Sequence, residues 1–300
     1  MFEIPIVVFC YKRLNKTKLL LDIIKTIEPR KVYLIHDGPK NLDDIENYNV
    51  LKLIKETNLN DKKIITSKVN LGLKKRIVSG LNQVFENENK AIILEDDCLP
   101  DKSFFYFCEK ILNIYEKDKT LAGVTGNNFQ KDNYINDQFY FSKFSHIWGW
   151  ATWKHVWDDF DLKINFWNDY KYSDDWKTIH KNQYERNYWT EIYDKIVNGN
   201  IESWAYSNQL CNWYFKRLTV TPKFNLVKNI GFDNFSTNTK TSEKNLIKET
   251  QSLQLDKIKK KKIIVSEKLD EYVFKNIYLS KTNRIKFLID NLKKRFIKKI

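Results

Sequence analysis

The segment Ala91-Ile92-Ile93-Leu94-Glu95-Asp96-Asp97 constrains the fold more than any other part of the sequence. Four apolar residues in a row predict a strand buried on both faces, as in sheets of parallel strands. Three acidic residues follow directly, and Leu99-Pro100 is expected to end the strand. Carboxylates at the carboxyl end of such a strand lie in the crevice where open α/β sheets bind ligands. The segment therefore predicts an α/β fold with an acidic site at one edge of the sheet.

The acidic residues Glu95, Asp96 and Asp97 have two interpretations. Three adjacent negative charges repel one another unless a cation or cationic side chains face them. Mg²⁺ and Mn²⁺ take oxygen ligands of this kind and share them with substrate phosphates. The alternative is a solvated acidic turn after a strand, and the cluster alone does not decide between the two.

The chain before this segment alternates between strand and helix patterns. Apolar, β-branched runs predict strands over 4–10, 31–35 and 63–67. Apolar residues at helical spacing, with capping residues and a proline stop, predict helices between them. This order, with the acidic segment last, is that of a doubly wound, Rossmann-like nucleotide-binding half.

Further polar residues follow the predicted strands and should reach the same crevice. Arg13 comes after the first strand. Asp37, in Asp-Gly-Pro, comes after the second, where it is either a turn former or a site carboxylate. Lys75 and Arg76 begin a helix after Gly72, a good environment for phosphate, although one glycine is far from a P-loop.

The second half of the chain is rich in aromatic residues. Four tryptophans lie between positions 148 and 157, around Gly149. Large aromatic side chains build cores, but exposed tryptophans also stack on sugar rings, and a glycine lets a ligand approach the backbone. We expect one or two of them to line a site and the rest to pack. The polar stretch 225–239, with one glycine, is typical of a closing loop.

The net charge of +14 is unevenly distributed, with +11 of it in residues 257–300. The nearly balanced body argues against a nucleic-acid groove. Residues 284–300 place apolar side chains on one helical face and lysines around the remainder, which is typical of a helix on an anionic membrane surface. The alternative is a surface helix packed on the body, with a solvated basic face.

Length and cysteine usage indicate the broad class. Three hundred residues suffice for one large α/β domain, alone or with an appended subdomain. The four cysteines have neither CxxC nor metal-ligand spacing, so we expect reduced core thiols. We also find no leader-like segment and no apolar run long enough for a membrane span. These features predict a cytoplasmic protein held peripherally at the inner face of the cytoplasmic membrane.

Several segments together resemble a known family. They are Pro5 to Arg13, Ile35 to Lys40, Asn70 to Leu73, Ile93 to Pro100, Trp148 to Trp153 and Asn225 to Phe232. In combination they resemble bacterial GT-A nucleotide-diphospho-sugar transferases of the glycosyltransferase family 2 type, over residues 4–239. The Glu-Asp-Asp segment is also distantly similar to N-acetylglucosaminyltransferase I.

The resemblance implies a GT-A fold, which is a Rossmann-like mixed sheet flanked by helices. It also implies that this fold binds a nucleotide sugar, typically a UDP-sugar in such families, through Mn²⁺ or Mg²⁺. It implies that Asp97 ligates the metal, and that the nucleotide sugar is bound by Tyr11, Arg13, Asp37, Lys75, Arg76, Glu95 and Asp96. The acceptor would be bound by Trp148, Gly149 and Trp150. The catalytic base maps best onto Glu202, but Ala205 stands where another acid is common, so Asp175 competes for this role.

These expectations describe a metal-dependent inverting glycosyltransferase that extends a surface glycan, such as a lipooligosaccharide, a capsule or a glycoprotein glycan. Residues 1–100 would bind the nucleotide sugar, 101–240 would bind the glycan or glycolipid acceptor and carry the base, and 241–300 would form a linker and basic amphipathic tail. Residue types alone leave a retaining outcome open. One alternative is a sugar-phosphate nucleotidyltransferase, which usually carries a Gly-rich first loop. The other is a non-enzymatic basic protein that binds membrane or nucleic acid.

Overall fold

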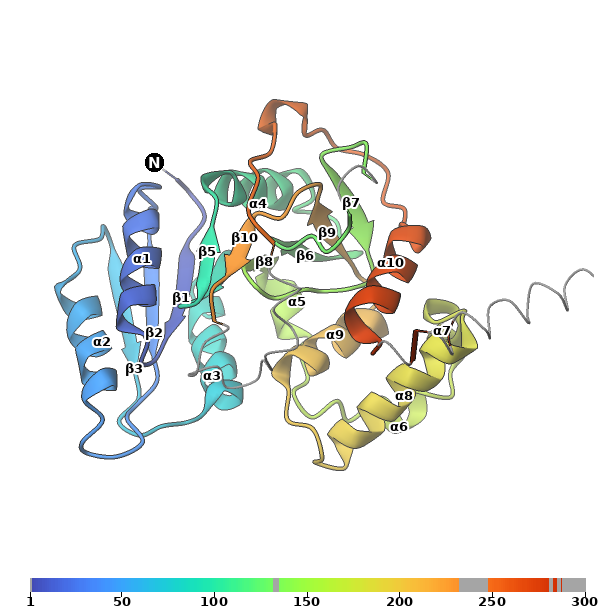
Figure 1. Cartoon of the computed structure of the whole chain (residues 1–300), viewed down its shortest axis with the longest axis horizontal. Helices are drawn as coiled ribbons and strands as arrows, with labels where there is room; N and C mark the ends of the chain where they lie inside the picture. The colour runs from blue at the N-terminus through green and yellow to red at the C-terminus, as the bar shows by residue number, and fades with distance from the viewer. Residues whose placement is uncertain (1, 132–134, 232–247, 281–282, 285–286, 288–300) are drawn as a thin grey trace, which may run out of the picture.

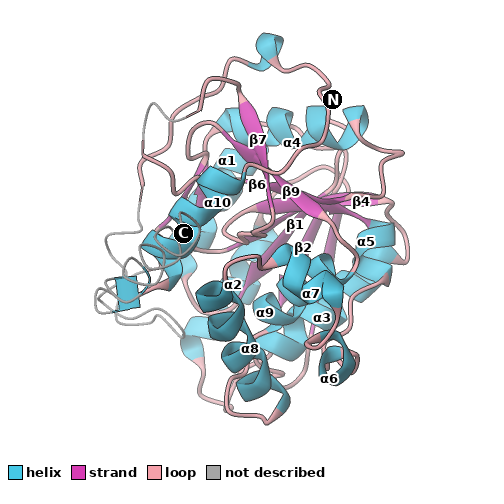
Figure 2. Ribbon diagram, turned by 90° about the vertical axis from the view of Figure 1, so that its right-hand side faces the viewer, coloured by secondary structure: helices cyan, strands magenta, loops and turns pink. Residues whose placement is uncertain are grey.

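The computed structural model describes residues 2–131, 135–231, 248–280, 283–284 and 287. An eight-stranded mixed sheet runs in the order β3-β2-β1-β4-β8-β6-β9-β7. Its strands are β1 (Ile6–Cys10), β2 (Val32–His36), β3 (Lys62–Thr66), β4 (Lys90–Glu95), β6 (Leu121–Thr125), β7 (Phe139–Ser142), β8 (Trp150–Trp153) and β9 (Leu218–Pro222). The predicted α/β class, a mixed sheet flanked by helices, is confirmed (Figures 1 and 2).

Helices flank this sheet. The first five are α1 (Leu14–Lys25), α2 (Ile45–Glu56), α3 (Leu73–Phe85), α4 (Lys102–Ile114) and α5 (Lys154–Asp158). The next four are α6 (Trp167–Tyr170), α7 (Asp174–Ile179), α8 (Gln183–Val197) and α9 (Trp204–Tyr214). After them come η2 (Leu255–Lys257), α10 (Glu267–Val273) and the π-helical turn η3 (Phe274–Tyr278).

The buried strands divide their side chains between two hydrophobic clusters. Along β1, Ile6 and Val8 pack with α1, α2 and α4 on one face, while Val7 and Phe9 pack with α3 on the other. This alternation follows from the period of two in a strand. β1, β2, β3 and β4 are parallel, so their carboxyl ends meet at one edge, as the sequence pattern predicts.

Two features of the sheet differ from expectation. β4 is parallel only to β1, since its other neighbour, β8, is antiparallel. The proline after the acidic residues does not end the strand pairing: Cys98–Pro100 forms β5, which pairs antiparallel with β10 (Val227–Asn229). A short two-stranded sheet therefore follows the acidic residues directly and connects them to the second half of the chain.

A helical lobe stands beside the sheet at the lower right of Figure 1. α6, α7, α8 and α9 surround a third cluster made mostly of aromatic side chains, and residues of α10 and η3 join it. Its largest fully buried side chains include Trp167, Trp176, Trp189 and Trp213. These rings pack edge to face or tilted, such as Trp167 against Trp176 with centroids 5.0 Å apart.

The predicted basic amphipathic helix over 284–300 lies outside the described residues, apart from positions 284 and 287. The same holds for most of the predicted closing loop, since residues 232–247 are not described. In the part of the chain that the structure covers, no helix is long and apolar enough to cross a membrane. All four cysteines are buried as free thiols, as predicted.

A buried carboxylate attaches α10 to the edge of the main sheet. Asp270 accepts hydrogen bonds from the Oγ of Ser142, 2.5 Å away, and from the backbone N–H of Lys143, 2.9 Å away. Burial raises the pKa of Asp270 from 3.8 to about 7, and these hydrogen bonds only partly oppose the rise. Glu185, on α8, raises this pKa further, because a second carboxylate disfavours the charge.

Asp270→Asn should change how stability depends on pH. Because its pKa is higher in the folded state, Asp270 contributes stability that is complete below about pH 4 and is lost as the pH rises to about 7, on the order of 4 kcal/mol at most. The difference between the melting temperatures of the wild type and the variant should therefore decrease as the pH rises from about 4 to about 7. Glu267→Gln, on the exposed side of α10, is the control. A difference independent of pH would contradict this role of Asp270.

Candidate active site

The acidic residues after β4 meet a cation that follows β1. The Nη1 of Arg13 lies 2.9 Å from Oδ1 of Asp96 and 2.7 Å from Oδ2 of Asp97. The backbone N–H of Tyr11 also donates to Asp96, over 3.3 Å. This contact forms because β1 and β4 are adjacent and parallel, so both chains leave the sheet at the same edge. The two predicted groups therefore come together at the expected place.

The cluster holds three carboxyl groups whose ionisation is mutually unfavourable, with the single guanidinium of Arg13 beside them. Burial, with repulsion from Asp97 and Asp96, raises the pKa of Glu95 to about 8. Burial and the charge of Asp97 raise the pKa of Asp96 to about 6. Three carboxylates around one guanidinium are a setting that a divalent cation would stabilise.

The donor chemistry of this cluster also fits Mg²⁺ or Mn²⁺, which prefer oxygen ligands. Among the residues described here, no group of three His, Cys, Asp or Glu side chains is arranged to hold a metal ion by itself. An ion at Asp97 would therefore take further ligands from water or from a substrate. Ions that bridge a protein carboxylate and substrate phosphates have this kind of shell.

Gly231 closes the space over Asp97. The pairing of β10 with β5 brings this part of the chain to the acidic edge, where the N–H of Ile230 donates to the backbone carbonyl of Asp97 over 2.8 Å. A Cβ on Gly231 would lie only 2.1 Å from Oδ2 of Asp97. Any side chain here would displace the carboxylate. The sequence pattern does not indicate this contact of Gly231 with Asp97, because the β5–β10 pairing that creates it joins segments more than a hundred residues apart.

Asp37 lies at the same edge but is committed to its own loop. Its carboxylate accepts hydrogen bonds from the N–H groups of Gly38, Leu71 and Gly72 and from the side chain of Asn70, at 2.9–3.1 Å. Asp37 therefore ties the end of β2 to the turn that begins α3. These contacts are those of a turn former, and a role of Asp37 as a site carboxylate that binds the nucleotide stays a prediction.

The basic residues at the start of α3 point in different directions. Lys75 is exposed. Arg76 is buried and donates from Nη2 to the carbonyl of Ile65 in β3, so its charged group faces the sheet beneath the turn. A direct contact of Arg76 with a pyrophosphate is not compatible with this geometry, and Lys75 is the residue available for that role. The direction of one side chain on a helix was not evident from the spacing of charges.

Tyr11 turns away from the acidic cluster, towards Asp44. Its hydroxyl donates to Oδ2 of Asp44 over 3.4 Å, and Lys12 forms an ion pair with the same carboxylate at 2.8 Å. The backbone of Tyr11, rather than its ring, contacts Asp96. These contacts connect the loop after β1 with the start of α2.

The tryptophan segment divides as expected into core and surface. Trp150, Trp153 and Trp157 are buried, whereas Trp148 is only half-buried and packs edge to face on Phe129. Gly149 has a positive φ of 72°. A Cβ there would lie 2.7 Å from Val227, so packing explains this glycine and the approach of a ligand does not.

The two candidate bases lie at opposite ends of α9. Glu202 is exposed just before Trp204, the first residue of the helix, whose ring packs on Trp150 with centroids 5.9 Å apart. Asp175 pairs with Lys216 beyond the last turn, at 2.9 Å. An 11-residue helix is about 16 Å long, so the structure does not bring the two acids together.

Glu202 also stands at the end of a chain of contacts that begins at the acidic cluster. Leu94, next to Glu95, packs on Gly149, and Trp150, the next residue, packs on Trp204. α9 packs on α3 as well. The start of α9 is therefore the part of the helical lobe that reaches towards the carboxyl edge of the sheet.

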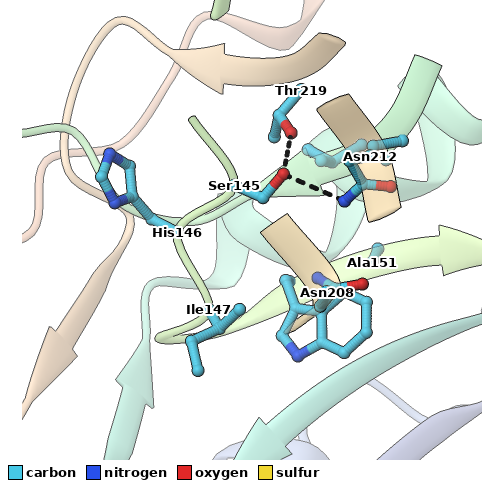
Figure 3. A pocket seen from close by; sticks show the side chains of 11 residues that line it. Ser145, His146, Ile147, Ala151, Asn208, Asn212 and Thr219 are labelled. Carbon is cyan, nitrogen blue, oxygen red and sulfur yellow. Dashed lines mark hydrogen bonds between the residues drawn. The ribbon is translucent and has the colours of Figure 1, made fainter. Parts of the chain in front are cut away.

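A small pocket opens behind Trp150, between the sheet and α9 (Figure 3). Ser145 lies at its centre: its hydroxyl is 2.8 Å from that of Thr219 and accepts a 3.2 Å hydrogen bond from Asn212. None of the residues that line it follows β1, β2 or β4. The pocket is therefore separate from the acidic edge.

No protein-family model matches the chain, and no curated protein matches it. Among solved structures, it is similar to mannosyltransferase PcManGT from Pyrobaculum calidifontis in complex with GDP-Man and Mn²⁺ (15% identity, 52% of this chain and 45% of that chain, TM-score 0.38). It is also similar to S. aureus TarS 1-349 (12% identity, 54% and 50%, TM-score 0.36) and to apo-UDP-glucose pyrophosphorylase (10% identity, 75% and 93%, TM-score 0.36). The chain spans about half the length of the first two. These similarities are too distant to indicate an activity.

Proposed function

We propose that the protein is a glycosyltransferase that takes its sugar from a nucleotide diphosphate. The observation that carries this proposal is the crowding of three carboxyl groups, those of Glu95, Asp96 and Asp97, beside Arg13 at the carboxyl edge of the parallel strands. Such an edge is where open α/β sheets bind nucleotides. A divalent ion there, with the diphosphate as its other ligand, would balance both sets of charges.

Charge accumulates on the nucleoside diphosphate as it leaves the sugar. A bound Mg²⁺ or Mn²⁺ supplies electrostatic stabilisation of that leaving group. Arg13, held against Asp96 and Asp97, adds a fixed positive charge at the same edge, and Lys75 adds a mobile one. Fixed charges of this kind lower the barrier because they need no rearrangement during the reaction.

Glu202 is the carboxylate best placed to accept a proton from the acceptor hydroxyl. It is exposed at the end of α9 that reaches towards the acidic edge. The hydroxyl that it deprotonates would attack the anomeric carbon from the side opposite the leaving diphosphate, so the configuration there would invert. Trp148, which keeps part of its ring exposed, is suited to stack on an acceptor sugar. The acceptor would be a surface glycan or glycolipid.

The first loop argues against a sugar-phosphate nucleotidyltransferase. Only three residues separate the end of β1 from Leu14, where α1 begins, and Arg13 in that short connection is turned to Asp96 and Asp97. A glycine-rich loop that could wrap a triphosphate has no room there. The direct step from strand to helix favours transfer of the sugar.

Asp97→Asn should remove metal-dependent donor binding, because it removes the charge that attracts the ion. With UDP-sugars and Mn²⁺ as probes at about a hundredfold excess over Kd, wild-type protein should gain about 3 kcal/mol of stability and the variant almost none. Turnover should fall at least about 100-fold. Asp22→Asn, at an exposed site on α1, serves as the control. A wild-type metal response in the Asp97 variant would refute the site.

Glu202→Gln should separate binding from chemistry. Loss of a general base lowers kcat by about 10²–10⁴ while the donor still binds, because the amide has nearly the same shape but accepts no proton. Asp175→Asn should keep wild-type kcat, since Asp175 pairs with Lys216, beyond the C-terminal end of α9 and away from Glu202. If the two variants exchange these results, the base has been misassigned.

Gly231→Ala should disable the site although it replaces no charged residue. The added Cβ collides with Oδ2 of Asp97, so the carboxylate must rotate away. We expect donor binding to lose its dependence on Mn²⁺ while the protein still folds, as judged by thermal unfolding. Gly199→Ala is the control: a Cβ there meets nothing within 4 Å, and its positive φ of 74° makes the substitution destabilising, so it separates a loss of stability from the collision with Asp97. Unchanged Mn²⁺-dependent donor binding in Gly231→Ala would show that the contact is not needed.

A further inference from the structure

We propose that the loops after β1, β2 and β3 form a membrane-binding face that inserts apolar side chains into an anionic lipid surface. Three side chains on these loops are unusually exposed for their type: Leu42 (89%), Ile45 (70%) and Val69 (61%). Leu14 and Leu73, the first residues of α1 and α3, are exposed by 37% and 39%. Apolar side chains so open to water at one edge mark an interaction surface.

The three loops form one continuous face. They follow parallel strands, so they leave the sheet on the same side. Hydrogen bonds also join them: Asn70 donates to the carbonyl of Gly38, and Asp44 accepts from the hydroxyl of Tyr11 and the N–H of Lys40. The exposed apolar residues therefore project from a fixed framework.

The charge of this face suits anionic lipid. The exposed acids of these loops are Asp43 and Glu46, whereas Asp37 and Asp44 are buried and hydrogen-bonded. Lys12 is paired with Asp44, and five further lysines stand around these loops: Lys16, Lys40, Lys68, Lys74 and Lys75. Apolar residues surrounded by lysines match a bilayer interface, where the apolar groups enter between headgroups that the lysines attract.

The face lies at the same edge of the sheet as the acidic residues. β2 lies two strands away from β4, which is about 10 Å at the usual strand spacing. A bilayer against Leu42 and Ile45 would therefore lie close to Asp97. The inference does not depend on the proposed function, but it would place a lipid-linked acceptor near that site.

The test is vesicle co-sedimentation of the full chain, with phosphatidylcholine vesicles that do or do not contain about one third phosphatidylglycerol. The triple variant Leu42→Ser, Ile45→Ser, Val69→Ser should bind the anionic vesicles at least about tenfold more weakly, because the insertion of even one of these side chains is worth about that factor. Leu19→Ser, 52% exposed further along α1, is the control and should bind like wild type. The basic tail is present in every protein compared.

Thermal unfolding checks that the triple variant folds. Lys40→Glu with Lys68→Glu keeps the apolar residues and should also weaken binding, with less dependence on salt. Wild-type vesicle binding by both variants would overturn the proposal. Equal binding of wild type to both kinds of vesicle would overturn the part of the proposal that requires anionic lipid. Failure of wild type to bind either kind would also overturn it, and would leave the face to a protein partner.

Discussion

The guanidinium of Arg13 between the carboxylates of Asp96 and Asp97 is the contact on which the site depends. It joins the residues that follow β1 to those that follow β4, and it holds the acids close together although they repel one another. Burial and repulsion among the acids raise the pKa values of Glu95 and Asp96, and the single charge of Arg13 only partly opposes the rise. A fold that keeps such a cluster at a sheet edge gives up stability there, and functional sites are where such conflicts are found.

The second half of the chain packs around this edge rather than forming a separate unit. β8 inserts antiparallel between β4 and β6, and β10 pairs with β5, so segments after residue 120 reach both sides of the acidic residues. Gly149 and Gly231 are placed where a side chain would collide with Val227 and with Asp97, respectively. The glycines therefore reflect close packing around the cluster. Specific backbone positions, more than further charged groups, shape the space in front of Asp97.

Local patterns in the sequence predict the strands and helices of the first hundred residues, because burial on both faces and helical spacing are properties of neighbouring residues. They also predict that Arg13 and the acidic triplet meet, since both follow parallel strands. Long-range pairing was beyond such reasoning: Cys98–Pro100 becomes a strand only because Val227–Asn229 lies beside it. The direction of Arg76, buried against Ile65, is likewise set by tertiary packing. From the charge of Arg76 and its position after Gly72, the sequence instead predicts that Arg76 binds phosphate.

The carboxyl groups at the carboxyl edge differ in how many hydrogen-bond partners they have, and this difference separates structural residues from the proposed binding residues. The carboxylate of Asp37 is satisfied by the turn before α3, so the loops after β2 and β3 are held in place. The carboxyl groups of Glu95, Asp96 and Asp97 share one guanidinium, that of Arg13, so a further cation would stabilise their charged forms. Under the proposed function, the hydrogen-bonded loops would fix the approach of the acceptor, and the acidic cluster would receive the charged donor.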